Sequence, residues 1–215
     1  MFATDHYIGR VVDKIEELGI RKDTIIIFMS DNGHSEETTY RIRDDNHKSG
    51  HPKGYFYGAS GGGFTGKWIG QKGTFLEGGI RVPAIISFPG RVPQGETRDQ
   101  IITAMDWLPT IMDLCGIKPK IGDPKLDGHS MIPIFDNPYR ISGYQNILNF
   151  QWHKTWAVRL DEWKLIGRQG KNTYQLFRLS DEEPERKNYA SEREDIVSSM
   201  LDFRRSWLQQ VMPSP

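Results

Sequence analysis

The chain has 215 residues, and its 28 lysines and arginines balance 28 aspartates and glutamates, so it carries no net charge at neutral pH. A neutral chain lacks the basic footprint that proteins use to bind nucleic acid or an anionic membrane surface, so neither partner is expected. No apolar run approaches the length of a membrane span. Cys115 is the only cysteine, which excludes an internal disulfide framework and a cysteine-rich metal site. Its apolar neighbours predict a small buried side chain.

The first half of the chain predicts helices and strands of an α/β sheet. Residues 1–18 have apolar side chains at steps of three and four, followed by Gly19, which is typical of a helix and its end. Apolar, β-branched runs at 24–29 and 83–88 predict two strands, and their continuous apolar character favours strands covered on both faces, as in a parallel sheet. A second helix is predicted around residues 105–114. This order of elements indicates the α/β class.

After residue 138 the pattern changes to short strands separated by polar turns, which is typical of an antiparallel meander followed by a helix. We therefore predict two domains, an α/β domain over residues 1–137 and a small antiparallel α+β subdomain over residues 138–215. The strands are expected at residues 146–150, 155–160, 163–166 and 174–179, and the helix at about residues 196–211.

Residues 34–82 separate the two apolar strands and show little hydrophobic periodicity. A long insertion of this kind inside a compact domain is usually functional. For residues 36–53 a solvated surface loop remains the alternative. The remainder is rich in glycine, including Gly61-Gly62-Gly63.

Asp31 and Asn32 directly follow the first predicted strand. Ligands of open α/β sheets bind beyond the carboxyl ends of strands. A carboxylate beside a carboxamide offers two hard oxygen donors, which suit Ca²⁺ or Mg²⁺ better than zinc. The alternative is an ordinary Asp-Asn-Gly turn, and these residues alone favour that alternative.

Residues 72–83 read Lys-Gly-Thr-Phe-Leu-Glu-Gly-Gly-Ile-Arg-Val-Pro and lead into the second strand. Lysine, glutamate and arginine separated by glycines are compatible with a loop that binds an anion. Lys72 would offer a compact charge with three donors to a sulfate or phosphate oxygen, and the glycines would let backbone approach a ligand closely. A glycine-rich turn with solvated charges is the alternative.

Together these segments resemble the sulfatase family of the alkaline phosphatase superfamily. Members of this family have a helix that ends in Leu-Gly, then Asp-Thr, a β strand and Ser-Asp-Asn-Gly. A second motif comes later in the chain: Lys-Gly-Thr, two residues, Glu-Gly-Gly, one residue, Arg, one residue and Pro. The matching residues are Leu18-Gly19, Asp23-Thr24, Ser30–Gly33 and Lys72–Pro83. Further agreement comes from Asp106–Thr110, Leu126–Ser130, Ala157–Arg159, Trp163–Ile166, Gln175–Leu179, Glu183–Glu185 and Asn188.

The resemblance implies an alkaline-phosphatase-like α/β fold, metal ligation by Asp31 and Asn32, and contact between Lys72 and the sulfate. The implied metal is Ca²⁺, with Mg²⁺ as the alternative, and the implied substrate is a sulfated small molecule or glycan. A periplasmic, secreted or lysosome-like location is expected on the same grounds. Related phosphatases commonly have Asp-His where this chain has Asp31-Asn32, which favours a sulfatase.

The family nucleophile is a formylglycine made from a Cys/Ser-x-Pro-x-Arg motif near the N-terminus. The sequence after Cys115 does not fit that motif, while Ser87-Phe88-Pro89-Gly90-Arg91 fits it at the end of the second strand. We interpret that fit as coincidence. We therefore expect the chain to be the C-terminal part of a sulfatase, inactive by itself. We expect it to self-associate or to pair with a missing N-terminal half that carries the formylglycine.

Three histidines, His34, His129 and His153, are candidates for a ligand or proton-donor role, because leaving-group protonation needs an acid. Of these, His34 is the candidate catalytic residue and His153 the candidate substrate-binding residue. A surface or structural histidine is the commoner case for each. Two other functions remain open: a phosphodiesterase or phosphonate hydrolase of the same superfamily, and a non-catalytic remnant that binds an anion or a partner.

Overall fold

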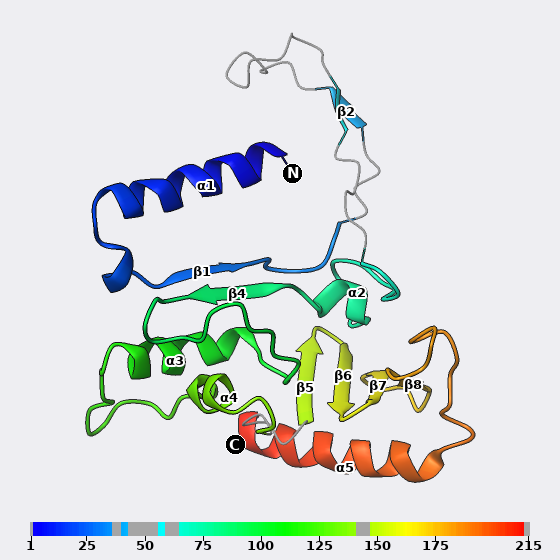
Figure 1. Ribbon diagram of the computed structural model, residues 1–215. Helices are drawn as coiled ribbons and strands as arrows, with labels where there is room; N and C mark the ends of the chain where they lie inside the picture. Colours follow the sequence, from blue (N-terminus) through cyan, green and yellow to red (C-terminus); the bar gives the residue numbers. More distant parts are fainter. Residues whose placement is uncertain (1, 36–39, 43–55, 59–64, 141–146, 213–215) are drawn as a thin grey trace. The chain divides into compact units, whose positions relative to one another are not determined.

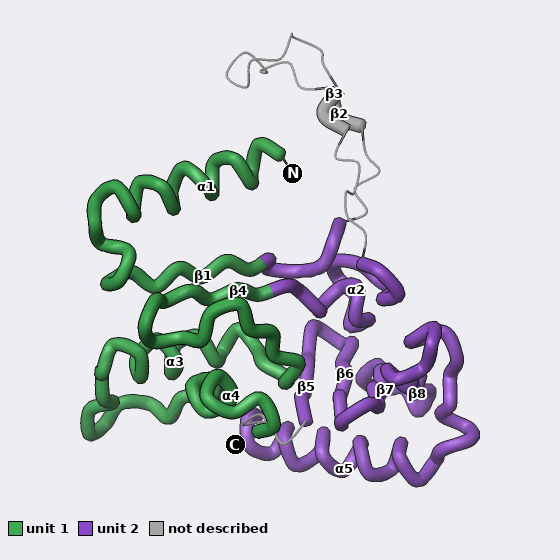
Figure 2. Tube along the Cα trace, in the orientation of Figure 1, with its two compact units in different colours: residues 1–29, 84–146 green, residues 30–83, 147–215 purple. Residues whose placement is uncertain are grey.

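The computed structural model describes residues 2–35, 40–42, 56–58, 65–140 and 147–212, with backbone only at 40–42 and 56–58. The chain divides into two compact units, each built from two separate stretches (Figure 2). Unit 1 consists of Met1–Met29 and Ala84–Asn146, and unit 2 of Ser30–Pro83 and Ile147–Pro215. The expected division into residues 1–137 and 138–215 stays a prediction.

Unit 1 begins with helix α1 (Phe2–Glu17) and a 3-10 turn, η1 (Arg21–Asp23), which lead into strand β1 (Ile26–Met29). The first helix and strand therefore lie where the apolar spacing predicts them. None of the residues of α1 is buried. The apolar stripe of this helix is thus at most half-covered, at Val12 and Ile15.

Strand β1 pairs with β4 (Ala84–Ser87), and the pairing is antiparallel. The expectation of parallel strands covered on both faces is wrong for this pair. Phe28 and Ile85 are direct cross-strand partners, and they are 45% and 59% exposed. A continuous apolar run indicates a strand, but it carries no information about the direction of the neighbouring strand or about what covers each face.

The second stretch of unit 1 contains three further helical elements: η3 (Ala104–Asp106), α3 (Trp107–Leu114) and α4 (Ile132–Asp136). The buried Asp106 carboxylate accepts the backbone N–H of Thr103 at 2.7 Å and that of His129 at 2.8 Å. The hydroxyl of buried Thr110 donates to the carbonyl of Asp106 at 2.6 Å and accepts the N–H of Met131 at 2.9 Å. Two of the family-like segments, Asp106–Thr110 and Leu126–Ser130, are therefore joined by structural hydrogen bonds.

Cys115 lies at the C-terminal end of α3 and is exposed, so the expectation of a buried thiol is wrong. The buried face of this helix contains Thr110 and Leu114, which are four residues apart. Cys115 follows Leu114 by one residue and points about 100° away from it around the helix. Apolar neighbours in sequence do not place a residue on the buried face.

Unit 2 contains a four-stranded antiparallel sheet in the order β5-β6-β7-β8, as the pattern after residue 138 predicts (Figure 1). Its strands are Ile147–Trp152, Thr155–Leu160, Trp163–Arg168 and Tyr174–Arg178. Helix α5 (Glu194–Val211) packs on the sheet. Their shared core consists of Trp156, Val158, Leu165, Leu176, Val197 and Met200. The alternation and turn residues of this region were sufficient to predict each strand.

The first stretch of unit 2 contains a short antiparallel pair, β2 (Tyr40–Ile42) with β3 (Phe56–Gly58), and one helical turn, α2 (Glu77–Ile80). Most of residues 36–53, for which a surface loop is the alternative interpretation, lies outside the described residues. No helix within the described ranges has the length and apolar character required to cross a membrane.

Candidate sulfate and metal site

Two backbone hydrogen bonds join the segment after β1 to the glycine-rich loop before β4. The N–H of Gly33 donates to the carbonyl of Gly79 at 2.9 Å, and the N–H of Lys72 donates to the carbonyl of His34 at 2.9 Å. Asp31 and Asn32 directly precede the first of these bonds. The structure therefore brings together the two segments that hold four of the five predicted site residues, all within unit 2.

Glycines permit close approach of backbones both between the two segments and within the loop. A Cβ atom on Gly33 would lie 1.8 Å from the carbonyl oxygen of Gly78, and one on Gly79 would lie 2.4 Å from that of Gln71. A Cβ on Gly78 would meet the carbonyl of Ile69 at 2.6 Å. Any side chain at these positions would overlap backbone. Gly33 is thus required by packing between the two motifs, whereas Gly78 and Gly79 are required by packing within the loop itself.

Asp31 and Asn32 are held by local bonds that leave one oxygen on each side chain available. The Oδ1 atom of Asp31 accepts the N–H of Asn32 at 2.9 Å, and the Nδ2 atom of Asn32 donates to the carbonyl of Gly33 at 2.7 Å. No hydrogen bond recorded among the described residues reaches Asp31 Oδ2 or Asn32 Oδ1.

One carboxylate oxygen and one amide oxygen fit one side of a Ca²⁺ or Mg²⁺ site. Both ions prefer at least six oxygen ligands, so two are an incomplete set. In the part of the chain that the structure describes, no three histidine, cysteine or acidic side chains are grouped to hold a metal. The donor set therefore fits a hard cation whose other ligands come from water, substrate or further protein groups.

Lys72 and His34 flank the hydrogen bond that joins the two segments. The side chain of Lys72 is exposed, and its ammonium takes part in no ion pair recorded for the described residues. His34 is half-buried, and its Nδ1 atom is buried without a hydrogen-bond partner in the described structure. An available ammonium and an unpartnered imidazole nitrogen thus lie on adjoining segments.

His153 lies in the hairpin turn between β5 and β6. Its backbone is in the left-handed region at φ 50°, its side chain is exposed, and its ring lies 5.1 Å from that of Trp152. None of the recorded contacts of the described residues joins it to Asp31, Asn32 or Lys72. Its predicted substrate-binding role therefore stays a prediction.

Ser87, which fits the bare nucleophile pattern, lies at the end of β4 in unit 1. Its hydroxyl accepts a hydrogen bond from the guanidinium of Arg21. This structural partner agrees with the interpretation that the pattern at residues 87–91 is coincidence.

A buried cluster of charged side chains contacts the loop that contains Lys72, and the sequence did not identify this cluster. The ammonium of Lys164 in β7 lies 2.5 Å from Glu77 Oε1 and 2.9 Å from Glu185 Oε1, and all three side chains are almost inaccessible to solvent. Arg81 approaches Glu77 Oε2 at 3.3 Å and Arg159 approaches it at 3.8 Å. Glu77 therefore pairs internally and does not face an anion.

The pKa values of the two carboxyl groups in this cluster are shifted in opposite directions. Burial raises the pKa of Glu185 above its usual value, and Lys164 offsets that effect only in part. Burial would also raise the pKa of Glu77, but Lys164, Arg159 and Arg81 together hold it below the usual value. A lysine in the middle of the apolar run Trp163–Ile166 is the signal that could have indicated a buried ion pair.

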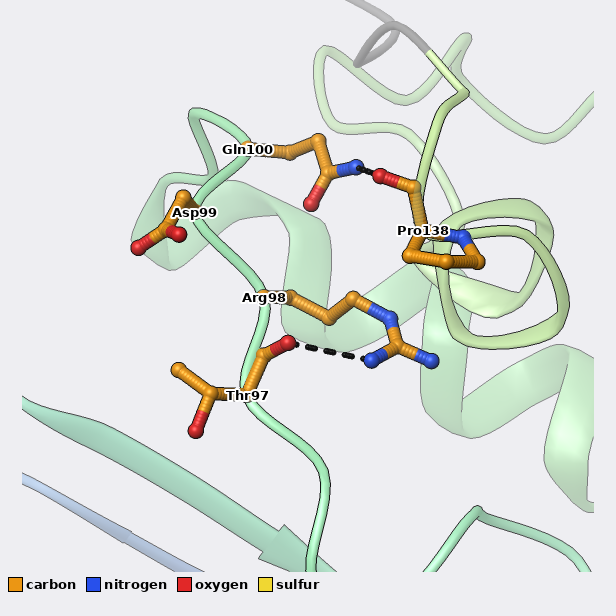
Figure 3. Close-up of a pocket in the computed structure, with 5 residues that line it drawn as sticks. All are labelled: Thr97, Arg98, Asp99, Gln100 and Pro138. Atoms are coloured by element: carbon orange, nitrogen blue, oxygen red, sulfur yellow. Dashed lines mark hydrogen bonds between the residues drawn. The ribbon is translucent and has the colours of Figure 1, made fainter.

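A surface pocket of about 300 Å³ in unit 1 is lined by Thr97, Arg98, Asp99, Gln100 and Pro138 (Figure 3). The guanidinium of Arg98 donates to the carbonyls of Ile134 and Phe135, at 2.8 Å each, at the end of α4. The amide of Gln100 donates to the carbonyl of Pro138. These donors complete a helix end, so we interpret the pocket as structural.

Family comparisons agree with the arrangement of the motifs. The sulfatase family model matches residues 1–117, and the model described as N-sulphoglucosamine sulphohydrolase, C-terminal, matches residues 67–209. The chain belongs to the sulfatase family.

Among curated proteins, this sulfatase chain is 30% identical over 163 residues to the steryl-sulfatase of Mus musculus. It is 31% identical over 159 residues to arylsulfatase D of Homo sapiens and 29% identical over 174 residues to the N-acetylgalactosamine-6-sulfatase of Rattus norvegicus. These alignments cover 72%, 70% and 81% of the chain, but only 23%, 24% and 29% of the relatives. The chain thus spans less than a third of the length of these relatives.

Solved structures show the same fold. The crystal structure of Ps i-CgsB in complex with k-i-k-neocarrahexaose is 25% identical, with a TM-score of 0.72, and the alignment covers 96% of this chain and 41% of that one. The structure of BT4656 in complex with its substrate, D-glucosamine-2-N,6-O-disulfate, is 19% identical, with a TM-score of 0.70 and coverage of 97% and 39%. The predicted alkaline-phosphatase-like α/β fold with a C-terminal antiparallel sheet is confirmed.

Proposed function

We propose that this chain supplies the cation-binding and sulfate-binding segments of an enzyme that hydrolyses sulfuric esters. The observation that carries the proposal is the pair of backbone hydrogen bonds, Gly33 to Gly79 and Lys72 to His34, that join the Asp31-Asn32 segment to the lysine loop. The sulfatase family of the chain supports the reaction type. The names of the curated relatives, all sulfatases, support it further.

In this proposal the oxygens of Asp31 and Asn32 bind Ca²⁺, with Mg²⁺ as the alternative. The cation would supply positive charge that neutralises the sulfate oxygens. Lys72 donates to a sulfate oxygen and stabilises the charge that develops there. His34 holds a proton at its imidazole for the leaving oxygen, and His153 contacts the substrate. The formylglycine nucleophile comes from sequence outside these 215 residues.

A sulfated carbohydrate is the substrate class that we propose. The solved neighbour at 25% identity is bound to k-i-k-neocarrahexaose, which supports a saccharide. A phosphonate monoester hydrolase from Silicibacter pomeroyi also shares the fold, at 17% identity and a TM-score of 0.55. That likeness concerns the fold alone, so phosphonate hydrolysis has no specific support. A location outside the cytosol stays a prediction.

Binding measurements on the chain test the site without depending on turnover. Isothermal titration with Ca²⁺ should detect binding that Asp31→Ala abolishes and that Asn32→Ala weakens less, because Asn32 contributes a neutral donor. Titration with inorganic sulfate in the presence of Ca²⁺ should show binding that Lys72→Ala weakens while Ca²⁺ affinity is kept. Lys67→Ala is the matched control, since Lys67 is an exposed lysine nearby that stacks over Trp68.

The proposal also predicts the pattern of activity. The 215-residue chain alone should not hydrolyse an aryl sulfate. In an enzyme restored with a formylglycine-bearing segment, Lys72→Ala should lower turnover by about a hundredfold or more, the usual effect of one lost charge-stabilising donor. If Asp31→Ala, Asn32→Ala and Lys72→Ala all bind Ca²⁺ and sulfate as the wild type does, the assignment of these residues to the site is wrong. The alternative, an ordinary turn at Asp31-Asn32 and a solvated loop at Lys72, would then be favoured.

We further propose that the exposed face of the β1–β4 pair associates with another polypeptide, either a second copy or an N-terminal sulfatase segment. The exposed partners Phe28 and Ile85 support this, because large apolar side chains adjacent on one face favour burial. Sedimentation over a range of concentrations tests it. A monomer at all concentrations that also fails to bind such a segment would exclude the association.

A further inference from the structure

Lys164 connects the C-terminal sheet to the loop that contains Lys72. Its ammonium donates to the carbonyl of Phe75 at 2.9 Å and lies 2.5 Å from Glu77 Oε1 and 2.9 Å from Glu185 Oε1. A lysine ammonium has three donors, so all three are occupied. Two of the three acceptors belong to the Lys72–Ile80 loop, which Lys164 therefore holds at two adjacent points.

Glu185 completes the network by binding both Lys164 and the backbone of Glu77. Its Oε2 atom accepts the backbone N–H of Glu77 at 2.8 Å, while its Oε1 atom faces Lys164. The backbone of Glu185 lies in the left-handed region at φ 63°, where glycine or asparagine is more easily accommodated. A glutamate persists in that conformation because its carboxylate joins the backbone of one segment to the side chain of another.

Backbone hydrogen bonds connect the part of the loop held by Lys164 to the candidate site. Next to Glu77, the N–H of Gly78 donates to the carbonyl of Ile69 at 2.7 Å, and the carbonyl of Gly79 accepts the N–H of Gly33. Lys72 lies between residues 69 and 77 and bonds His34 through its own N–H. A displacement at Glu77 would thus alter the positions of Lys72 and of the segment after β1.

We infer that Lys164 is a positioning residue, which together with Glu77 and Glu185 sets the geometry of the Lys72 loop. This inference deepens the proposed function and rests on it for the role of Lys72. A buried ion pair commonly loses as much in desolvation as it gains in attraction, so the network need not add net stability. The network instead gives the loop a defined position, because a buried charge is strongly destabilising unless its partners lie within hydrogen-bond distance.

Amide hydrogen exchange tests the inference without reference to activity. Lys164→Met removes the ammonium while keeping a long apolar side chain in β7. We expect the amides of Lys72 and Gly78 to exchange about tenfold faster or more, with amides of the β5–β6 pair unchanged. Lys171→Met, at an exposed turn lysine, is the control and should leave both sets unchanged. Titration with inorganic sulfate in parallel should show weaker binding by Lys164→Met.

The outcomes separate this inference from the proposed function. Faster loop exchange in Lys164→Met, in a chain whose wild type binds no sulfate, would support the positioning role and refute the sulfate site. Unchanged loop exchange with wild-type sulfate affinity would refute the positioning role and leave the sulfate site intact. If Lys164→Met does not fold, Glu185→Gln decides, because it keeps the Lys164–Phe75 bond yet replaces one of the two accepting oxygens of Glu185 by an NH2 group, which cannot accept from Lys164 or from the N–H of Glu77. Unchanged loop exchange in Glu185→Gln would equally refute the inference.

Discussion

Substitution of Gly33 by alanine tests whether the two motifs pack backbone against backbone. The new Cβ would lie 1.8 Å from the carbonyl oxygen of Gly78 and 2.9 Å from the Cα of Gly79. The φ of Gly33 lies outside the left-handed region, so the cost arises from this overlap alone. The two segments must separate, which weakens the bonds from Gly33 to Gly79 and from Lys72 to His34.

The structure sets the size of the expected effect. Forcing one extra methyl group into a tightly packed site costs about 1–3 kcal/mol. Each lost backbone hydrogen bond adds roughly 0.5–1.5 kcal/mol. We therefore expect Gly33→Ala to lower the free energy of unfolding by about 2–6 kcal/mol. In parallel it should weaken Ca²⁺ binding, because Asp31 and Asn32 precede the displaced residue.

Urea denaturation followed by tryptophan fluorescence measures the first effect, and calorimetric titration with Ca²⁺ measures the second. Gly9→Ala is the control, because Gly9 lies in α1 and a Cβ there would meet nothing within 4 Å. Alanine inside a helix should be neutral or stabilising by about 0.5–1 kcal/mol. If Gly33→Ala unfolds at the same urea concentration as the wild type, the close packing of the two motifs is wrong.

Further predictions concern buried polar groups in each unit. Burial raises the pKa of Glu185, so above the usual value of 4.5 the folded chain still binds a proton that the unfolded chain has released. The free energy of unfolding should therefore fall as the pH rises above 4.5, and Glu185→Gln should remove that fall. The lowered pKa of Glu77 acts oppositely, so stability should fall as the pH drops below 4.5, and Glu77→Gln should remove this second slope. Urea midpoints measured across the pH range check both slopes, and a slope retained in its variant would contradict the assignment. Thr110→Val should lower the free energy of unfolding by about 1–3 kcal/mol, because it leaves the buried N–H of Met131 without an acceptor. Thr110→Ser keeps the hydroxyl, so its effect should be smaller. Equal losses of stability in the two variants would indicate that packing, and not the hydrogen bond, is the cause.

Local patterns in the sequence determined much of the secondary structure. The strands of the C-terminal sheet follow from apolar runs bounded by polar turns such as Asp161-Glu162, and α1 follows from apolar steps of three and four before Gly19. Strand and helix formation depend on neighbours within a few residues, so a single sequence carries that information. The motifs at Asp31-Asn32 and Lys72 likewise stand in the sequence as candidate ligand-binding residues.

Only the tertiary structure decided which distant groups meet. The antiparallel pairing of β1 with β4, the exposure of Cys115 and the contact between Gly33 and Gly79 depend on segments separated by tens of residues. Lys164 appears in the sequence as a charge within an apolar strand, and its burial between Glu77 and Glu185 required the sheet and the loop to be packed together. Desolvation and ion pairing are properties of the folded surroundings of a side chain, so composition and spacing could mark Lys164 as unusual but could not provide its partners.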